Sequence, residues 1–118
     1  VKADVIKKTE AVIRKDVIFA SNTSTLPITG LAKNSVRPDQ FIGVHFFSPV
    51  DKMPLVEIIP GEKSGDRALA AALDYVGMIK KTPIVVKDTR GFYTNRVVPP
   101  YLNEAMLMVK EGISPALI

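Results

Sequence analysis

The sequence predicts an α/β fold in which short strands and helices alternate around one sheet. Its 118 residues, 47% of them hydrophobic, suffice for one core and are too few for two ordinary domains. Unbroken β-prone runs alternate with stretches whose apolar residues recur at helical spacing. Nine prolines and seven glycines keep the elements short. The predicted order α, β, α, β, β, α, β, α is that of the second half of a doubly wound domain followed by the first helix of another unit.

The first third of the chain predicts two helices and one strand. Apolar residues at helical spacing among charges predict a surface helix over 2–15. The continuous β-prone run 17–20 is typical of a central parallel strand covered on both faces. Pro27 suits the first turn of a short helix that ends at 33 or 34, with Thr25 as a candidate cap.

Two adjacent strands are predicted over 41–47 and 55–59. The few residues between them are too short for a parallel crossover, which needs about a dozen, so the strands are expected to be antiparallel neighbours. A symmetric connection places His45 directly opposite Glu57. A slip of one residue would put the two side chains on opposite faces of the sheet.

The last third of the chain predicts a helix, a strand and a long helix. Ser64 or Asp66 is a candidate cap for the first helix, 83–86 is a short strand, and the long helix follows Gly91 and ends near Gly112. The apolar stripes of the two helices are Leu69, Leu73 and Val76, and Val98, Leu102, Ala105 and Val109.

Composition excludes several functional classes. The chain has no cysteine and one histidine, so it has no disulfide framework, no thiolate nucleophile and no structural zinc cage, and we expect no metal. No apolar run approaches the ~20 residues of a membrane-spanning helix. The net charge of +4 comes from sixteen basic residues dispersed along the chain, which does not favour a nucleic-acid partner.

His45 and Glu57 are the candidate catalytic residues. Each is a polar residue in an otherwise apolar strand, and an unpaired buried carboxylate costs several kcal/mol. A carboxylate beside an imidazole fixes its tautomer and stabilises the imidazolium, which makes a general base. The alternative is a structural ion pair without a catalytic role.

Three further polar residues are candidates for binding. Ser24 and Asn22 follow the first strand, where open α/β sheets bind ligands, and Asn95 stands near the start of the last helix. Helix capping is the alternative role for Ser24 and Asn95. A serine hydrolase using Ser24 and His45 is a rival, weakened because no G-x-S-x-G surrounds the serine. The glycines contain no G-x-G-x-x-G pyrophosphate motif.

The runs 19–26, 43–50, 55–59 and 91–96, taken together, resemble the L-3-hydroxyacyl-CoA dehydrogenase family. Asp51-Lys52-Met53-Pro54 is similar to the dehydrogenase region of multifunctional fatty-acid oxidation α-subunits. The resemblance implies the following roles: His45 as catalytic base, Glu57 as its orienting partner, Ser24 and Asn95 as substrate contacts, and Asn22 as a residue near the nicotinamide of NAD. Ser48 departs from the Asn that many members have at this position.

The resemblance also implies a domain organisation and a set of partners. Residues 1–90 are expected to be the C-terminal half of a Rossmann-type NAD-binding domain, and 91–118 the start of a helical C-terminal domain, so we expect an internal fragment of a longer enzyme. The implied reaction is the NAD-dependent oxidation of (3S)-3-hydroxyacyl-CoA in fatty-acid β-oxidation, by an oligomeric parent in the bacterial cytoplasm, or in mitochondria or peroxisomes. The alternative is a non-catalytic acyl-CoA-binding or assembly module of the same fold.

Overall fold

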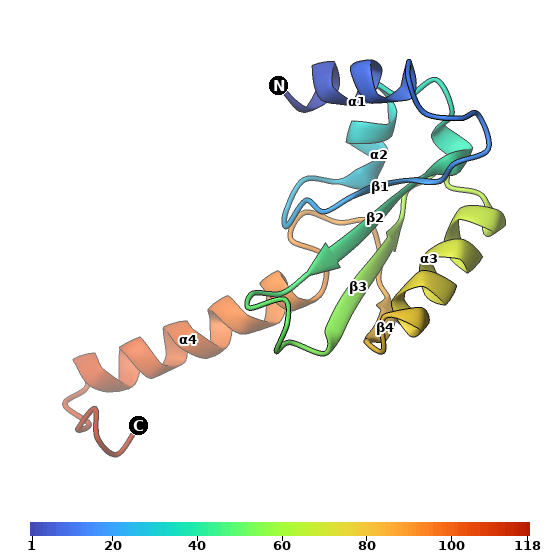
Figure 1. Cartoon of the computed structure of the whole chain (residues 1–118). Coiled ribbons are helices and arrows are strands. Elements are labelled where there is room, and N and C mark those ends of the chain that lie inside the picture. Colours follow the sequence, from blue (N-terminus) through green and yellow to red (C-terminus); the bar gives the residue numbers. More distant parts are fainter.

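A computed structural model describes residues 1–118 (Figure 1). Its elements in chain order are α1 (Lys2–Glu10), β1 (Phe19–Ser21), α2 (Ile28–Ala32), the 3₁₀ turn η1 (Pro38–Gln40), β2 (Phe41–Phe46), β3 (Leu55–Pro60), α3 (Asp66–Met78), β4 (Thr82–Val85) and α4 (Thr94–Lys110). The predicted mixed α/β fold is confirmed, and the predicted strands 41–47, 55–59 and 83–86 agree with β2, β3 and β4 to within one residue at each end.

The four strands form one mixed sheet in the order β1-β2-β3-β4. The β1–β2 and β3–β4 pairs are parallel, whereas β2 and β3 are antiparallel. His45 pairs with Glu57 in the β2–β3 ladder, so the predicted register is confirmed. The short connection between these strands is further held by Lys81, whose Nζ donates to the carbonyl of Met53 at 2.7 Å.

The sheet has a hydrophobic cluster on each face. The cluster beside α1 and α2 consists of Ile6, Ile28, Leu31, Ala32, Phe41, Ile59 and Phe92, and the cluster beside α3 of Ile42, Val44, Val56, Ile58, Ala68, Ala72 and Val76. Successive residues of a strand point to opposite faces, so His45 and Glu57 lie on the same face as Phe41 and Ile59. The polar pair therefore continues the α1–α2 face of the core toward the carboxyl end of β2.

Within these 118 residues, the predicted strand 17–20 stands first in the sheet, beside β2. β1 comprises only Phe19–Ser21 and pairs with β2 alone. Coverage on both faces is nevertheless present, since Phe19 packs against the cluster under α1 and α2 and Ile18 against the cluster under α3. An apolar run records what covers the faces of a strand, whereas its lateral place depends on which other strands pair with it.

Two predicted helix ends differ from the structure. The first helix ends at Glu10 rather than at residue 15, because Ile6 is its only buried residue and Val12, in the following turn, is 82% exposed. A further helical turn would therefore not be stabilised by packing against the core. The third helix begins after Gly65 without a side-chain cap, and the hydroxyl of Ser64 instead donates to the carbonyl of Phe41 at 2.5 Å.

The buried stripe of α3 is shifted from the predicted one. Ala68, Ala72 and Val76 face the sheet, and Leu69 and Leu73 pack at its margin. The small alanine side chains let the helix lie close to the sheet, which leaves the larger leucines only partly covered.

The predicted cap of the short helix is also wrong. α2 starts after Pro27 with no local side-chain cap, and Thr25 does not serve it. The carboxylate of Asp88 accepts hydrogen bonds from the N–H groups of Ile28 at 2.6 Å and Thr29 at 2.7 Å instead. A residue from the segment before α4 thus supplies the cap.

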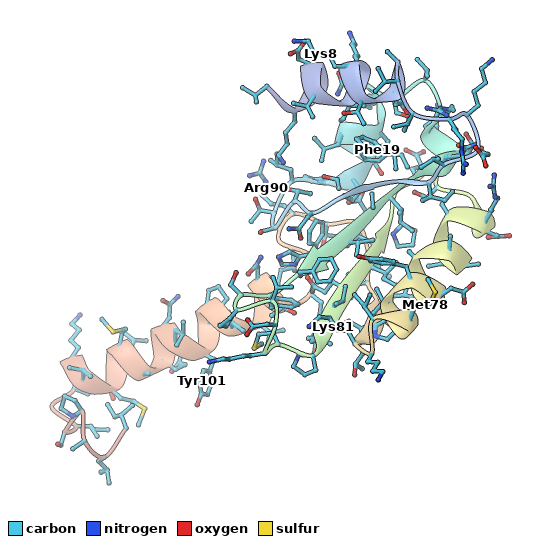
Figure 2. All side chains as sticks on the ribbon, viewed as in Figure 1. Lys8, Phe19, Met78, Lys81, Arg90 and Tyr101 are labelled. Carbon is cyan, nitrogen blue, oxygen red and sulfur yellow. The ribbon has the colours of Figure 1, made fainter.

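The long final helix is confirmed, and it projects from the body of the molecule (Figure 1). None of its residues is buried, and Figure 2 shows Tyr101, 74% exposed, on the part of α4 that lies away from the sheet. The radius of gyration is accordingly 17.4 Å, against the ~13 Å typical of a compact chain of this length. No helix has the length and apolar character needed to cross a membrane.

Candidate active site

The side chains of His45 and Glu57 form a direct hydrogen bond. Nδ1 of His45 lies 2.8 Å from Oε2 of Glu57, and the two side chains are 6% and 0% exposed. Adjacent antiparallel strands present these residues directly opposite each other, so the pair requires no backbone irregularity. The predicted contact is present, and the pair is shielded from water.

The second oxygen of Glu57 is held by the beginning of α4. Oε1 accepts the N–H groups of Tyr93 at 3.1 Å and Thr94 at 2.8 Å. These are among the N–H groups that have no partner within a helix, and the helix dipole favours a negative charge at this end. Glu57 thereby connects His45 to the first turn of α4, and the N–H groups of that turn stabilise the charge of the Glu57 carboxylate.

This hydrogen-bonding pattern assigns the histidine tautomer. An ionised carboxylate only accepts hydrogen bonds, so with Glu57 in its ionised form the proton of this bond is carried by Nδ1 of His45. Nε2 is then unprotonated, and it has no partner within the chain. A histidine held in this state has one nitrogen ready to accept a proton and a carboxylate ready to stabilise the resulting cation.

Two aromatic rings lie against the imidazole. The ring centroid of Phe47 is 4.6 Å and that of Phe92 is 6.0 Å from that of His45, both in tilted arrangements. Phe92 is also part of the core beside α1 and α2. The rings pack against the imidazole and restrict its orientation.

Ser24 and Asn95 are brought into the same cluster. Nδ2 of Asn95 donates to the backbone carbonyl of Ser24 at 2.7 Å. Thr94, the neighbour of Asn95, contacts Glu57, so consecutive residues of α4 reach the loop after β1 and the histidine's partner. A serine nucleophile activated by histidine requires a hydrogen bond between the two side chains. The hydroxyl of Ser24 makes no such bond to His45.

Asn22 lies where β1 ends and connects it to β2. Its Oδ1 accepts the N–H of Phe46 at 3.0 Å, and its side-chain NH₂ has no partner within the chain. Asn22 also borders an apolar hollow of about 360 Å³ between β1 and α1. The parallel strands β1 and β2 end at the same end of the sheet, where Asn22, Ser24 and His45 lie.

Sequence reasoning missed the contributions of Asp88, Tyr93 and Thr94. Asp88 fixes the start of α2, and the other two residues act on Glu57 through backbone N–H groups. Backbone donors leave no signature in side-chain type. Asp88 does follow a predicted strand, which is a signal for a polar site, but its partners lie 59 and 60 residues away along the chain.

Comparison with known proteins agrees with this arrangement. Residues 1–89 match the family described as 3-hydroxyacyl-CoA dehydrogenase, NAD binding domain. The chain belongs to the 3-hydroxyacyl-CoA dehydrogenase family. This confirms the predicted family and the Rossmann-type fold.

Individual relatives in the family extend the match to nearly the whole chain. The chain is 54% identical over 113 residues to the fatty acid oxidation complex subunit alpha of Idiomarina loihiensis, which covers 96% of the chain and 16% of that protein. It is 42% identical to the (S)-3-hydroxybutyryl-CoA dehydrogenase PaaH1 of Ralstonia eutropha, with a TM-score of 0.92 over 99% of the chain and 42% of that structure. The 3-hydroxybutyryl-CoA dehydrogenase of Escherichia coli K12 is 28% identical, with a TM-score of 0.88 over 96% of the chain and 24% of that structure. The chain therefore spans less than half the length of each of these relatives.

Proposed function

We propose that these residues carry the proton-transfer site of an NAD-dependent dehydrogenase that oxidises (3S)-3-hydroxyacyl-CoA to 3-ketoacyl-CoA in fatty-acid β-oxidation. The observation that supports this most strongly is the buried pair of His45 and Glu57 with Nε2 of the histidine left free. A binding module without catalysis has no use for a histidine held in this state. Membership of the dehydrogenase family supports the same reaction.

In the proposed mechanism His45 is the general base. Nε2 accepts the proton of the 3-hydroxyl group as the C3–H bond breaks and the C3–O bond becomes a carbonyl. The imidazolium that forms is stabilised by the carboxylate of Glu57, which stays in place because α4 holds its other oxygen. The hydride that leaves C3 would be taken up by a bound NAD, which supplies the oxidant of the reaction.

The described residues fit one end of this cofactor. The side-chain NH₂ group of Asn22 is an unpartnered donor at the carboxyl end of β1. His45 lies near the carboxyl end of the neighbouring parallel strand β2. Ligands of open α/β sheets bind at such an edge. The 118 residues contain no G-x-G-x-x-G motif for the pyrophosphate. We therefore propose that, within these residues, NAD is contacted only at its nicotinamide end, by Asn22.

Ser24 and Asn95 are the proposed substrate contacts. The hydroxyl of Ser24 is free of His45, and Asn95 holds the loop that carries this serine. We propose that the hydroxyl of Ser24 donates to the oxygen at C3, and that Asn95 contacts the thioester side of the acyl-CoA through its side-chain oxygen. The absence of a hydrogen bond between Ser24 and His45 disfavours the rival serine hydrolase.

Further parts of the proposal concern the whole protein. The family match ends at residue 89 and α4 projects beyond it, which supports the expected boundary between 1–90 and a helical domain that begins within 91–118. We propose that the chain is a segment of a longer, oligomeric enzyme, because the relative from Idiomarina is named as a subunit of a complex. The intracellular NAD pool and a bacterial relative favour the cytoplasm as the compartment.

The deciding experiment is an assay of the whole protein that carries these residues. NADH formation is followed with (3S)-3-hydroxybutyryl-CoA and NAD, for the natural protein and for His45→Gln. The proposal requires turnover by the natural protein, and a loss of turnover with retained acyl-CoA binding in the variant. Acyl-CoA binding without NADH formation would favour the binding module, and labelling of Ser24 by a fluorophosphonate probe would favour the hydrolase.

A further inference from the structure

Asp88 connects two segments that are far apart in the sequence. Its two carboxylate oxygens accept the first N–H groups of α2, those of Ile28 and Thr29. A helix of five residues is too short to be stable by itself, and α2 has no cap within its own part of the chain. Asp88 therefore caps the start of α2, which is also held by the burial of Ile28 in the core and by the hydrogen bond from the N–H of Glu62 to Oγ1 of Thr29.

The loop between β1 and α2, residues 22–27, is consequently fixed at both ends. At one end Asn22 is bound to the N–H of Phe46 in β2. At the other end α2 is bound to Asp88. Ser24 lies between these two anchors.

The middle of the loop is tied to the same segment as α2. The carbonyl of Thr25 accepts the N–H of Gly91 at 3.1 Å, and the carbonyl of Ser24 accepts Nδ2 of Asn95 at 2.7 Å. Both of these are single hydrogen bonds between uncharged groups, whereas the contact of Asp88 is a charged pair of bonds and is the strongest of the ties.

We propose that Asp88 is a positioning residue that holds loop 22–27, and with it Ser24, in place at the carboxyl end of β1. The inference rests on the proposed function, in which Ser24 contacts the substrate. Asp88 makes no hydrogen bond to His45 or Glu57, so it acts only through loop 22–27. Replacement of Asp88 is expected to lower kcat/KM for the acyl-CoA while leaving the hydrogen bond between His45 and Glu57 intact.

The test is Asp88→Asn in the whole protein. One amide oxygen replaces two carboxylate oxygens, and the amide NH₂ group faces an N–H donor, so at least one of the two bonds is lost. We expect kcat/KM for the acyl-CoA to fall by roughly ten- to a hundredfold, the factor that corresponds to one lost charge-assisted hydrogen bond. KM for NAD stays unchanged.

A second background separates positioning from general stabilisation. In Ser24→Ala, Asp88→Asn is expected to lower kcat/KM by no more than about twofold further, because the group that it positions is already missing. Glu10→Gln is the matched control: Glu10 accepts the N–H of Val36 at 2.8 Å, before β2 begins and at the opposite end of that strand from His45. Its kcat/KM is expected to stay at the level of the natural protein.

Amide hydrogen exchange tests the anchor without reference to activity. Asp88→Asn should speed exchange at Ile28 and Thr29, whereas Glu10→Gln should speed it at Val36 and leave Ile28 and Thr29 unchanged. If Asp88→Asn yields too little folded protein, Asp88→Glu, which keeps the charge on a longer side chain, takes its place with the same expected pattern.

The outcomes distinguish the two proposals. A natural protein without dehydrogenase activity would overturn the proposed function. An active natural protein in which Asp88→Asn leaves kcat/KM or exchange unchanged, or lowers kcat/KM equally with and without Ser24, would overturn the role of Asp88 alone.

Discussion

Replacing Glu57 by glutamine tests the chemistry of the buried pair. The carboxylate of Glu57 accepts hydrogen bonds from three donors: the Nδ1–H of His45 and the N–H groups of Tyr93 and Thr94. An amide of the same shape has only one acceptor oxygen and places an NH₂ group where the other oxygen was. Glu57→Gln therefore cannot satisfy all three donors in their present state.

The two orientations of the new amide differ in which hydrogen bonds they lose. If its oxygen faces His45, its NH₂ group opposes the N–H groups of Tyr93 and Thr94, and two unpaired donors cost about 1–3 kcal/mol each. If its oxygen faces α4, its NH₂ group can donate to Nδ1 of His45, which leaves no unpaired donor but forces the proton onto Nε2. The second orientation is the cheaper one, and it abolishes the base.

We therefore expect Glu57→Gln to lower kcat by roughly 10²–10⁴, the usual contribution of a general base, with KM and folding stability little changed. The assay is NADH formation by the whole protein, with the protonated nitrogen identified by ¹⁵N NMR of the imidazole. Glu62→Gln is the control, since Glu62 is exposed and its side chain makes no hydrogen bond. A variant that keeps kcat within tenfold of the natural value while Nδ1 remains protonated would refute the reasoning.

Three other predictions address the remaining parts of the site and the core. His45→Gln should lower kcat by about 10²–10⁴ at unchanged acyl-CoA affinity, and the double variant with Glu57→Gln should be no slower than His45→Gln alone; losses that multiply would contradict a shared role. Asn22→Ala should raise KM for NAD and not for the acyl-CoA, and the opposite result would remove Asn22 from the cofactor side. Gly43→Ala should lower the free energy of unfolding by about 1–3 kcal/mol in urea titrations, because the new Cβ would lie 2.7 Å from the side chain of Ile28. Gly30→Ala, with nothing within 4 Å, is the control and should stabilise α2 by about 0.5–1 kcal/mol.

The pairing of β2 with β3 was predictable because it is local in the sequence. A short connection leaves an antiparallel hairpin as the only arrangement, and alternation of side chains then fixes which residues face each other. His45 and Glu57 are 12 residues apart, and each is conspicuous in an apolar strand. Loop length and polarity together sufficed to identify this contact.

Contacts between distant segments were not predictable in the same way. Nothing in the residue type of Asp88 indicates that it binds the N–H groups of Ile28 and Thr29, and the donors of Tyr93 and Thr94 belong to the backbone. The strands that flank β1 depend on the rest of the sheet rather than on the residues of β1 itself. The binding roles of Ser24, Asn22 and Asn95 remain predictions.

The turn before α4 explains how a buried carboxylate is held without a basic residue. Gly91 and Phe92 both adopt positive φ angles, 78° and 51°, and the second of these is unfavourable for a residue with a side chain, at a cost of about 1–2 kcal/mol. Two contacts offset this cost: the ring of Phe92 is buried in the core, and the turn brings the N–H groups of Tyr93 and Thr94 onto Glu57.

No lysine or arginine forms a salt bridge with Glu57, whose only ionisable partner is His45. A cation beside the carboxylate would neutralise it and would disfavour the imidazolium through repulsion. The N–H groups of a helix start stabilise the negative charge with partial charges only. The turn thus stabilises the carboxylate of Glu57 while leaving most of its charge to stabilise the imidazolium that the proposed reaction forms at His45. A lysine or arginine partner would stabilise the carboxylate but would disfavour that imidazolium.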